Sequence, residues 1–170
     1  MGLIATAGDV LRAGRLPDAT PESRDERGPQ PVAFMRSRNR GAVLFVHRMA
    51  AGEWMAIVAL LERAGDAWDE IAIVHKPWWD PADPFEDGEL IVTGGHSRFA
   101  VGSGPDVALV AGQAAAQTTV AGASGEIVVH PPARHFIYLA EIANHDEPVI
   151  LTARRAGDEE TSVFEPLDIR

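Results

Sequence analysis

The feature that most constrains this fold is a series of short apolar runs, each ended by turn-forming residues. Between residues 106 and 165 four such runs occur, at 107–111, 118–121, 136–140 and 149–153. They are separated by Gly112, by the glycines of residues 122–125, by Pro131 and Pro132, and by the polar segment 144–148. Runs of this length, rich in residues that suit a pleated surface and bounded by turn formers, predict strands.

The middle of the chain allows two interpretations. Residues 42–47 form an apolar run that predicts a buried strand. In residues 54–62, Trp54, Ile57, Val58 and Leu61 match the spacing of a helix face, but the intervening positions are apolar too, so no polar face remains. Turn residues on both sides and the alternating run 68–75 favour a meander of three strands over a helix.

Further apolar segments at residues 90–93, 98–101 and 161–164 extend this pattern. Residues 76–89 should leave the sheet, because Pro77, Pro81 and Pro84 cannot sit in a central ladder. One short helix is predicted at residues 7–16, with Gly14 near its end and Pro17 stopping it. The predicted fold is therefore all-β, an antiparallel β-sandwich, immunoglobulin-like or related, of about ten short strands with one short N-terminal helix.

Residues 106–158 carry a resemblance to a family of modules. The theme is a strand ending in glycine, a polar alternating strand, an aromatic strand and a late strand led by proline, at residues 107–112, 117–120, 135–140 and 148–154. This stretch resembles bacterial immunoglobulin-like or transthyretin-like β-sandwich modules. The resemblance implies a binding or structural role rather than catalysis. The chain has no cysteine, so it lacks the disulfide core of true immunoglobulin domains.

The distribution of charge suggests a division of the chain. Residues 1–41 hold seven arginines and five acidic residues, whereas residues 42–170 hold eight basic and twenty acidic residues. We interpret residues 1–41 as an N-terminal helix followed by a Pro/Arg-rich arm or linker, and residues 42–170 as a single β-sandwich domain. The segment 16–31 is either a surface linker or a partner-docking arm, to which Arg36, Arg38 and Arg40 just beyond it would contribute.

Charge and composition also limit the partners. A formal net charge of −10 should repel a phosphate backbone, so we expect no nucleic-acid partner. No apolar run approaches the roughly 20 residues that span a bilayer, and the start of the chain lacks the segments of a secretory signal. We therefore expect a cytoplasmic protein with no membrane partner. Without cysteine, disulfides and thiolate chemistry are excluded.

The loop at residues 78–89 is the first candidate site. Asp80, Asp83, Glu86, Asp87 and Glu89 place five carboxylates close together, which could supply oxygen ligands for Ca²⁺. The spacing is not that of an EF-hand, and a solvated acidic loop explains it as well. Trp78 and Trp79 either form a stacking platform for a ligand, or one of them fills the core. The ligand-binding candidates are Trp78, Trp79, Asp80, Asp83 and Asp87.

Histidines offer a second candidate site. His130 and His135 flank a Pro–Pro bend and form the closest pair, and His75, His96 or a loop carboxylate would complete a Zn²⁺ site. The metal candidates are His75, His130 and His135, although isolated histidines are more often ordinary surface or core residues. No nucleophile elbow, phosphate loop or nucleotide fingerprint is present, so no catalytic residue is predicted.

These observations favour a non-catalytic module that binds another protein or forms a homo-oligomer, without a cofactor. The alternative is a small-ligand or metal-binding protein, or an enzyme, that uses residues 78–89 and nearby histidines with Ca²⁺ or Zn²⁺. Pockets between sheets or at barrel mouths make that alternative reasonable.

Overall fold

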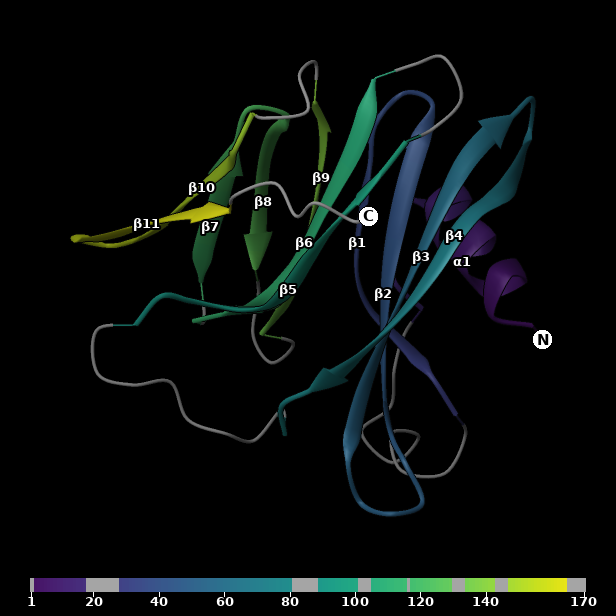
Figure 1. Ribbon diagram of the computed structural model, residues 1–170, viewed down its shortest axis with the longest axis horizontal. Coiled ribbons are helices and arrows are strands. Elements are labelled where there is room, and N and C mark those ends of the chain that lie inside the picture. Colours follow the sequence, from purple (N-terminus) through teal and green to yellow (C-terminus); the bar gives the residue numbers. More distant parts are fainter. Residues whose placement is uncertain are drawn as a thin grey trace. The chain divides into compact units, whose positions relative to one another are not determined.

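The computed structural model describes residues 2–17, 28–80, 89–100, 105–115, 117–129, 134–142 and 147–164, without the side chains of residues 93–96. Within these ranges the chain forms one helix and eleven strands, and neighbouring strands pair antiparallel (Figure 1). The predicted all-β class with one short N-terminal helix is confirmed. The chain divides into two compact units, Met1–Asp83 and Pro84–Arg170.

The first unit is a four-stranded meander with one helix. Its elements are α1 (Leu3–Ala13), β1 (Gln30–Arg36), β2 (Arg40–Arg48), β3 (Trp54–Ala64) and β4 (Ala67–Trp78), with strand order β1-β2-β3-β4. The predicted three-strand meander is confirmed, and the ambiguous segment is strand β3. β1 was not predicted as a strand, because it lies among the residues assigned to the arm. It pairs with β2 from Gln30 to Arg36, so β1 is part of the sheet of the first unit.

Helix α1 packs on one face of this sheet. The buried helix residues Ala7, Val10 and Leu11 belong to one apolar cluster with buried residues of β2 and β3: Val43, Phe45, Ile57, Ala59 and Leu61. The predicted helix at 7–16 was wrong in its bounds, since α1 begins at Leu3 and ends at Ala13. Gly14 ends it in the left-handed conformation, with φ of 65°, a conformation that glycine adopts without steric cost.

Strand β4 continues further than predicted. Residues 76–78 were expected to leave the sheet, yet Lys76, Pro77 and Trp78 pair with β3. The physical reason is position: β4 is the last strand in the sheet order, and an edge strand tolerates a proline that lacks an N–H donor.

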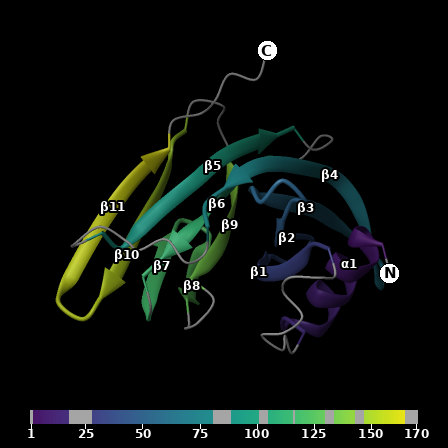
Figure 2. The same cartoon turned by 90° about the horizontal axis from the view of Figure 1, so that it is seen from below.

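The second unit contains two sheets (Figure 2). Their strands are β5 (Ile91–Phe99), β6 (Asp106–Ala114), β7 (Thr118–Gly122), β8 (Gly125–Val129), β9 (His135–Ile142), β10 (Val149–Arg155) and β11 (Asp158–Phe164). One sheet has the order β11-β10-β7-β8 and the other β5-β6-β9. The four runs between residues 106 and 165 are all strands, as predicted, whereas β8 was not foreseen.

Two predicted breaks lie inside strands. Gly112 was expected to end a run, but β6 continues through it to Ala114. A Cβ atom at Gly112 would collide with the Val92 carbonyl and lie 2.8 Å from the Phe136 ring, so only glycine fits this close approach. The segments 90–93 and 98–101 were expected to be separate, but β5 runs from Ile91 to Phe99 through Gly94 and Gly95, with a register shift between Thr93 and Gly95.

Two polar contacts join the sheets of the second unit. The buried Tyr138 of β9 accepts a hydrogen bond from the Ser124 amide (2.9 Å) and donates one to the Gly125 carbonyl (3.0 Å), at the β7–β8 turn. Glu160 of β11 accepts hydrogen bonds from the amides of Leu90 (2.7 Å) and Ile91 (3.3 Å), at the start of β5. Because these groups lie on different sheets, they fix how the two sheets face each other.

We predict that Leu11→Ala lowers the free energy of unfolding of the first unit by about 2–5 kcal/mol, because it opens a cavity between α1 and the sheet. All four tryptophans lie before residue 84, so tryptophan fluorescence in a urea titration reports on this unit. Arg12→Ala, on the exposed side of the same helix, is the control and should change stability by less than about 1 kcal/mol. Equal losses for both variants would contradict the packing of α1.

We predict that Tyr138→Phe destabilises the second unit by about 1–3 kcal/mol, since it removes two hydrogen bonds that each contribute about 0.5–1.5 kcal/mol. Burial also raises the pKa of Tyr138 above its ordinary value. Tyr138 in the unfolded chain therefore ionises at a lower pH than Tyr138 in the folded chain. The stabilisation that the neutral Tyr138 contributes is complete below about pH 10 and is lost as the pH rises through the folded pKa. Urea titrations monitored by circular dichroism at several alkaline pH values should show a steeper loss for the native chain than for the variant. Parallel losses would contradict this role.

Candidate functional site

The two tryptophans of the first candidate site differ in exposure. Trp78 ends β4 and is buried, with 8% of its surface exposed, whereas Trp79 is half-buried. Their ring centroids lie 4.9 Å apart at an interplanar angle of 58°. Trp78 therefore packs in the interior rather than presenting an open stacking platform.

The carboxylates of that loop are only partly placed. Asp80 is exposed, whereas Asp83 and Asp87 lie outside the described residues. Because most of these carboxylates lie outside the described residues, Ca²⁺ binding by residues 80–89 stays a prediction.

The predicted zinc ligands fall on different elements. His75 is exposed on β4 of the first unit, and His135 is half-buried at the start of β9 in the second unit. His130 lies outside the described residues. Within the described ranges, no group of three histidine, aspartate or glutamate side chains is placed to hold a metal ion. Zinc binding that involves His130 stays a prediction.

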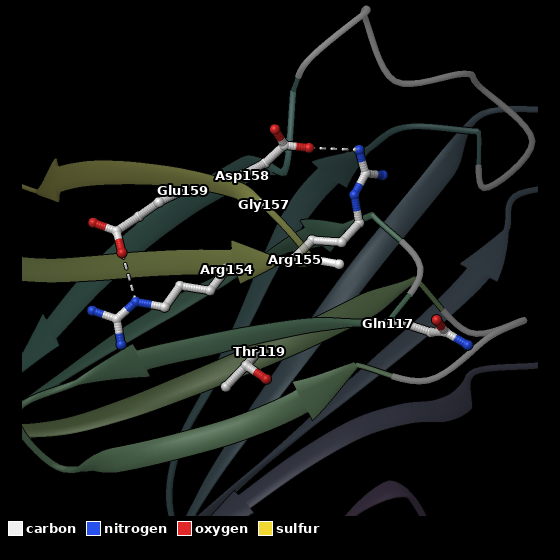
Figure 3. Close-up of a pocket in the computed structure, with 8 residues that line it drawn as sticks. Gln117, Thr119, Arg154, Arg155, Gly157, Asp158 and Glu159 are labelled. Atoms are coloured by element: carbon white, nitrogen blue, oxygen red, sulfur yellow. Dashed lines mark hydrogen bonds and ion pairs between the residues drawn. The ribbon is translucent and has the colours of Figure 1, made fainter.

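A shallow hollow lies at one end of the four-stranded sheet of the second unit (Figure 3). Its volume is about 510 Å³, and it is formed by the start of β7 and the turn between β10 and β11. The lining residues are Gln117, Thr119, Arg154, Arg155, Ala156, Gly157, Asp158 and Glu159. None of them was a predicted site residue.

The charges in this hollow are paired within the hairpin. The Nε of Arg154 donates to Oε2 of Glu159 at 2.7 Å, and an Nη2 of Arg155 lies 3.4 Å from Oδ2 of Asp158. Figure 3 shows the two guanidinium groups pointing away from each other, each toward its own carboxylate. A cradle for one small anion needs donors that converge, so this arrangement suits a broad polar contact better than a buried ligand.

The hollow is one part of a larger surface, which we call the outer face. Strand register aligns Thr119, Arg154 and Glu159 in one row across β7, β10 and β11. The next row contains Ala121, Thr152 and Thr161, with the two threonine hydroxyls 3.4 Å apart. In the row after that, Ile150 pairs with Val163. On β8, Val128 pairs with Thr119 and so extends the first row.

This outer face exposes apolar side chains. Val128, Ile150 and Val163 are 50%, 50% and 54% exposed. The alternate residues of the same strands point inward and are buried, among them Val120, Leu151 and Ala153. The signal was present in the sequence as the alternation from Ile150 to Arg154. It was missed because residues 149–153 were taken as one apolar block.

Comparison with protein-family models, curated proteins and solved structures found no match. In the part of the chain that the structure describes, no helix has the length and apolar character to cross a membrane. Function is therefore inferred from geometry alone, and the outer face is the strongest candidate surface.

We predict that the Arg154–Glu159 pair contributes less than about 1 kcal/mol to stability, because both side chains are more than half exposed, at 60% and 58%. A double-mutant cycle with Arg154→Ala and Glu159→Ala, measured by urea unfolding, gives the coupling free energy directly. A value above about 2 kcal/mol would show that the pair is structural and not available to exchange partners on binding.

Proposed function

We propose that this protein is a non-catalytic binding module that associates with a second copy of itself through the outer face. The observation that carries the proposal is the exposed pair of Ile150 and Val163 on that face. Of the five large hydrophobic residues found exposed in the described ranges, three lie on this face, and the others, Met49 and Ile73, belong to the first unit. Apolar side chains gathered on one sheet face are typical of interaction surfaces.

The hydrophobic effect supplies a driving force for covering this face. Removing apolar surface from water contributes about 25 cal/mol for each Å² buried. The branched side chains lie beside threonines and Ala121, which are short, so few long flexible side chains surround them. Ordering such a surface costs little conformational entropy, which favours association.

Charge favours a second copy as the occupant. The chain has a net charge of −10, so two copies repel each other over most of their surface. The outer face holds one cation and two anions, Arg154, Glu159 and Glu126, and so is close to neutral. In a two-fold interface the same patch meets itself, and Arg154 of one copy can face a carboxylate of the other.

The alternative of a ligand, metal or enzyme site at residues 78–89 stays a prediction. No observation on the described residues favours it, since Trp78 is buried and most of that loop lies outside the described ranges.

Sedimentation velocity over a range of protein concentrations tests the proposal. The native chain should form dimers, and Ile150→Glu should weaken dimerisation at least about tenfold, which is 1.4 kcal/mol, because it places like charges across the two-fold axis. The matched control is Ile73→Glu, the same change at an exposed position on β4 in the first unit, which should leave dimerisation unchanged.

Either of two results would contradict the proposal: a native chain that stays monomeric at every concentration, or an equal effect of both substitutions. Ile150→Thr, a milder change that suits an exposed strand position, separates loss of the contact from loss of the fold. Circular dichroism melting checks that each variant is folded.

A further inference from the structure

A second surface of different character lies at one end of the first unit. Four exposed arginines occur there, which we call the arginine end: Arg15, Arg36, Arg38 and Arg63. They come from the segment after α1, from the end of β1 and the turn that follows it, and from the end of β3.

Contacts in the structure bring these segments together. The Nη1 of Arg36 donates to the Leu11 carbonyl in the last turn of α1 at 2.6 Å, which places β1 beside the helix terminus and Arg15. The amide of Arg63 donates to the Asn39 carbonyl at 2.7 Å, which joins the end of β3 to the β1–β2 turn. Arg38 lies in that turn. A hydrogen bond from the Ser37 amide to the Arg40 carbonyl closes the turn.

The arginine end has no carboxylate partner among the described residues. The ion pairs found among the described residues involve other arginines, namely Arg12, Arg154 and Arg155. Arg36 and Arg63 bond to the backbone carbonyls of Leu11 and Gly65, so neither guanidinium group is paired with a carboxylate. The nearest acidic residues along the chain, Glu62 and Asp66, form no ion pair with these arginines within the described part of the chain.

We infer that the arginine end binds a carboxylate-rich segment of another protein. A guanidinium presents a planar fork of donors that matches a carboxylate in two parallel hydrogen bonds. Several such groups on neighbouring turns can bind successive acidic side chains of one peptide. This surface is separate from the outer face and does not depend on the proposed self-association.

Overall charge favours a short acidic segment over nucleic acid. At physiological salt, charges influence each other over about 8 Å, so a short peptide at this end interacts mainly with the charges of this end and little with the acidic remainder of the chain. A long polyanion would extend past them along a chain whose residues 42–170 hold twenty acidic against eight basic side chains.

The test is fluorescence anisotropy with a labelled peptide of about twelve glutamates, added to the full chain at about 50 mM salt, where surface charges are weakly screened. The native chain should bind it with an affinity that falls as salt is added. The triple variant Arg15→Ala, Arg38→Ala, Arg63→Ala should weaken binding at least about tenfold, because charge-assisted hydrogen bonds are lost. Arg36 is kept, since it also holds the end of α1.

The matched control removes three arginines that are ion-paired in the structure: Arg12→Ala, Arg154→Ala, Arg155→Ala. It has the same net charge as the test variant and should keep peptide binding within about twofold. Three outcomes would overturn the inference: no binding by the native chain, an equal loss in both triple variants, or tighter binding of an oligothymidylate of the same length. The last would identify a nucleic-acid surface instead.

Discussion

The alternation of side chains across the four-stranded sheet is the constraint on which the rest of the account depends. Val120, Leu151 and Ala153 have no exposed surface, so these positions on the inner face of the sheet are shielded from water. A shift of one residue in register would turn these side chains to water and bring Thr119, Thr152 and Arg154 inside. The buried inner face therefore determines that Ile150 and Val163 point outward, in spite of the cost of exposing them.

Polar contacts then hold this sheet against its neighbour. Tyr138 reaches the β7–β8 turn, and Glu160 binds two consecutive amides before and at the start of β5. The two contacts come from different strands and are separated along the chain, so together they restrict sliding of one sheet over the other. A surface on such a support is preorganised, which lowers the entropy lost when a partner binds.

The sequence was sufficient to predict the strands with clear apolar patterns. Residues 54–62 lack a polar opposite face, and this correctly favoured strand β3 over a helix. It was not sufficient where tertiary context overrides local signals. Pro77 is tolerated because β4 is an edge strand, and Gly112 reflects the close approach of Val92 and Phe136 rather than a turn. β1 was missed because Pro31 ends a segment of four prolines and dense mixed charge that resembles a linker, although a register shift at Pro31 accommodates the proline.

The candidate surfaces were harder to predict than the strands. The outer face needs the pairing of β7, β10 and β11, because only register shows that Ile150 and Val163 are neighbours. The arginine end forms only where three segments of the chain lie close together in the fold. Of its four arginines, the sequence analysis grouped only Arg36 and Arg38. The predicted carboxylate and histidine sites rested mainly on closeness along the chain, and they stay predictions because Asp83, Asp87 and His130 lie outside the described residues.

Methyl NMR with a soluble paramagnetic agent tests the central claim, that the outer face is covered by a second copy, most directly. Methyl groups of Ile150, Val163 and Val128 should relax rapidly in dilute protein, where the agent reaches them, and progressively more slowly as concentration rises. The methyl groups of Ile73, on β4 of the first unit, should show no such change. Relaxation of the three outer-face residues that stays the same at all concentrations, or protection that appears at Ile73 instead, would contradict the account.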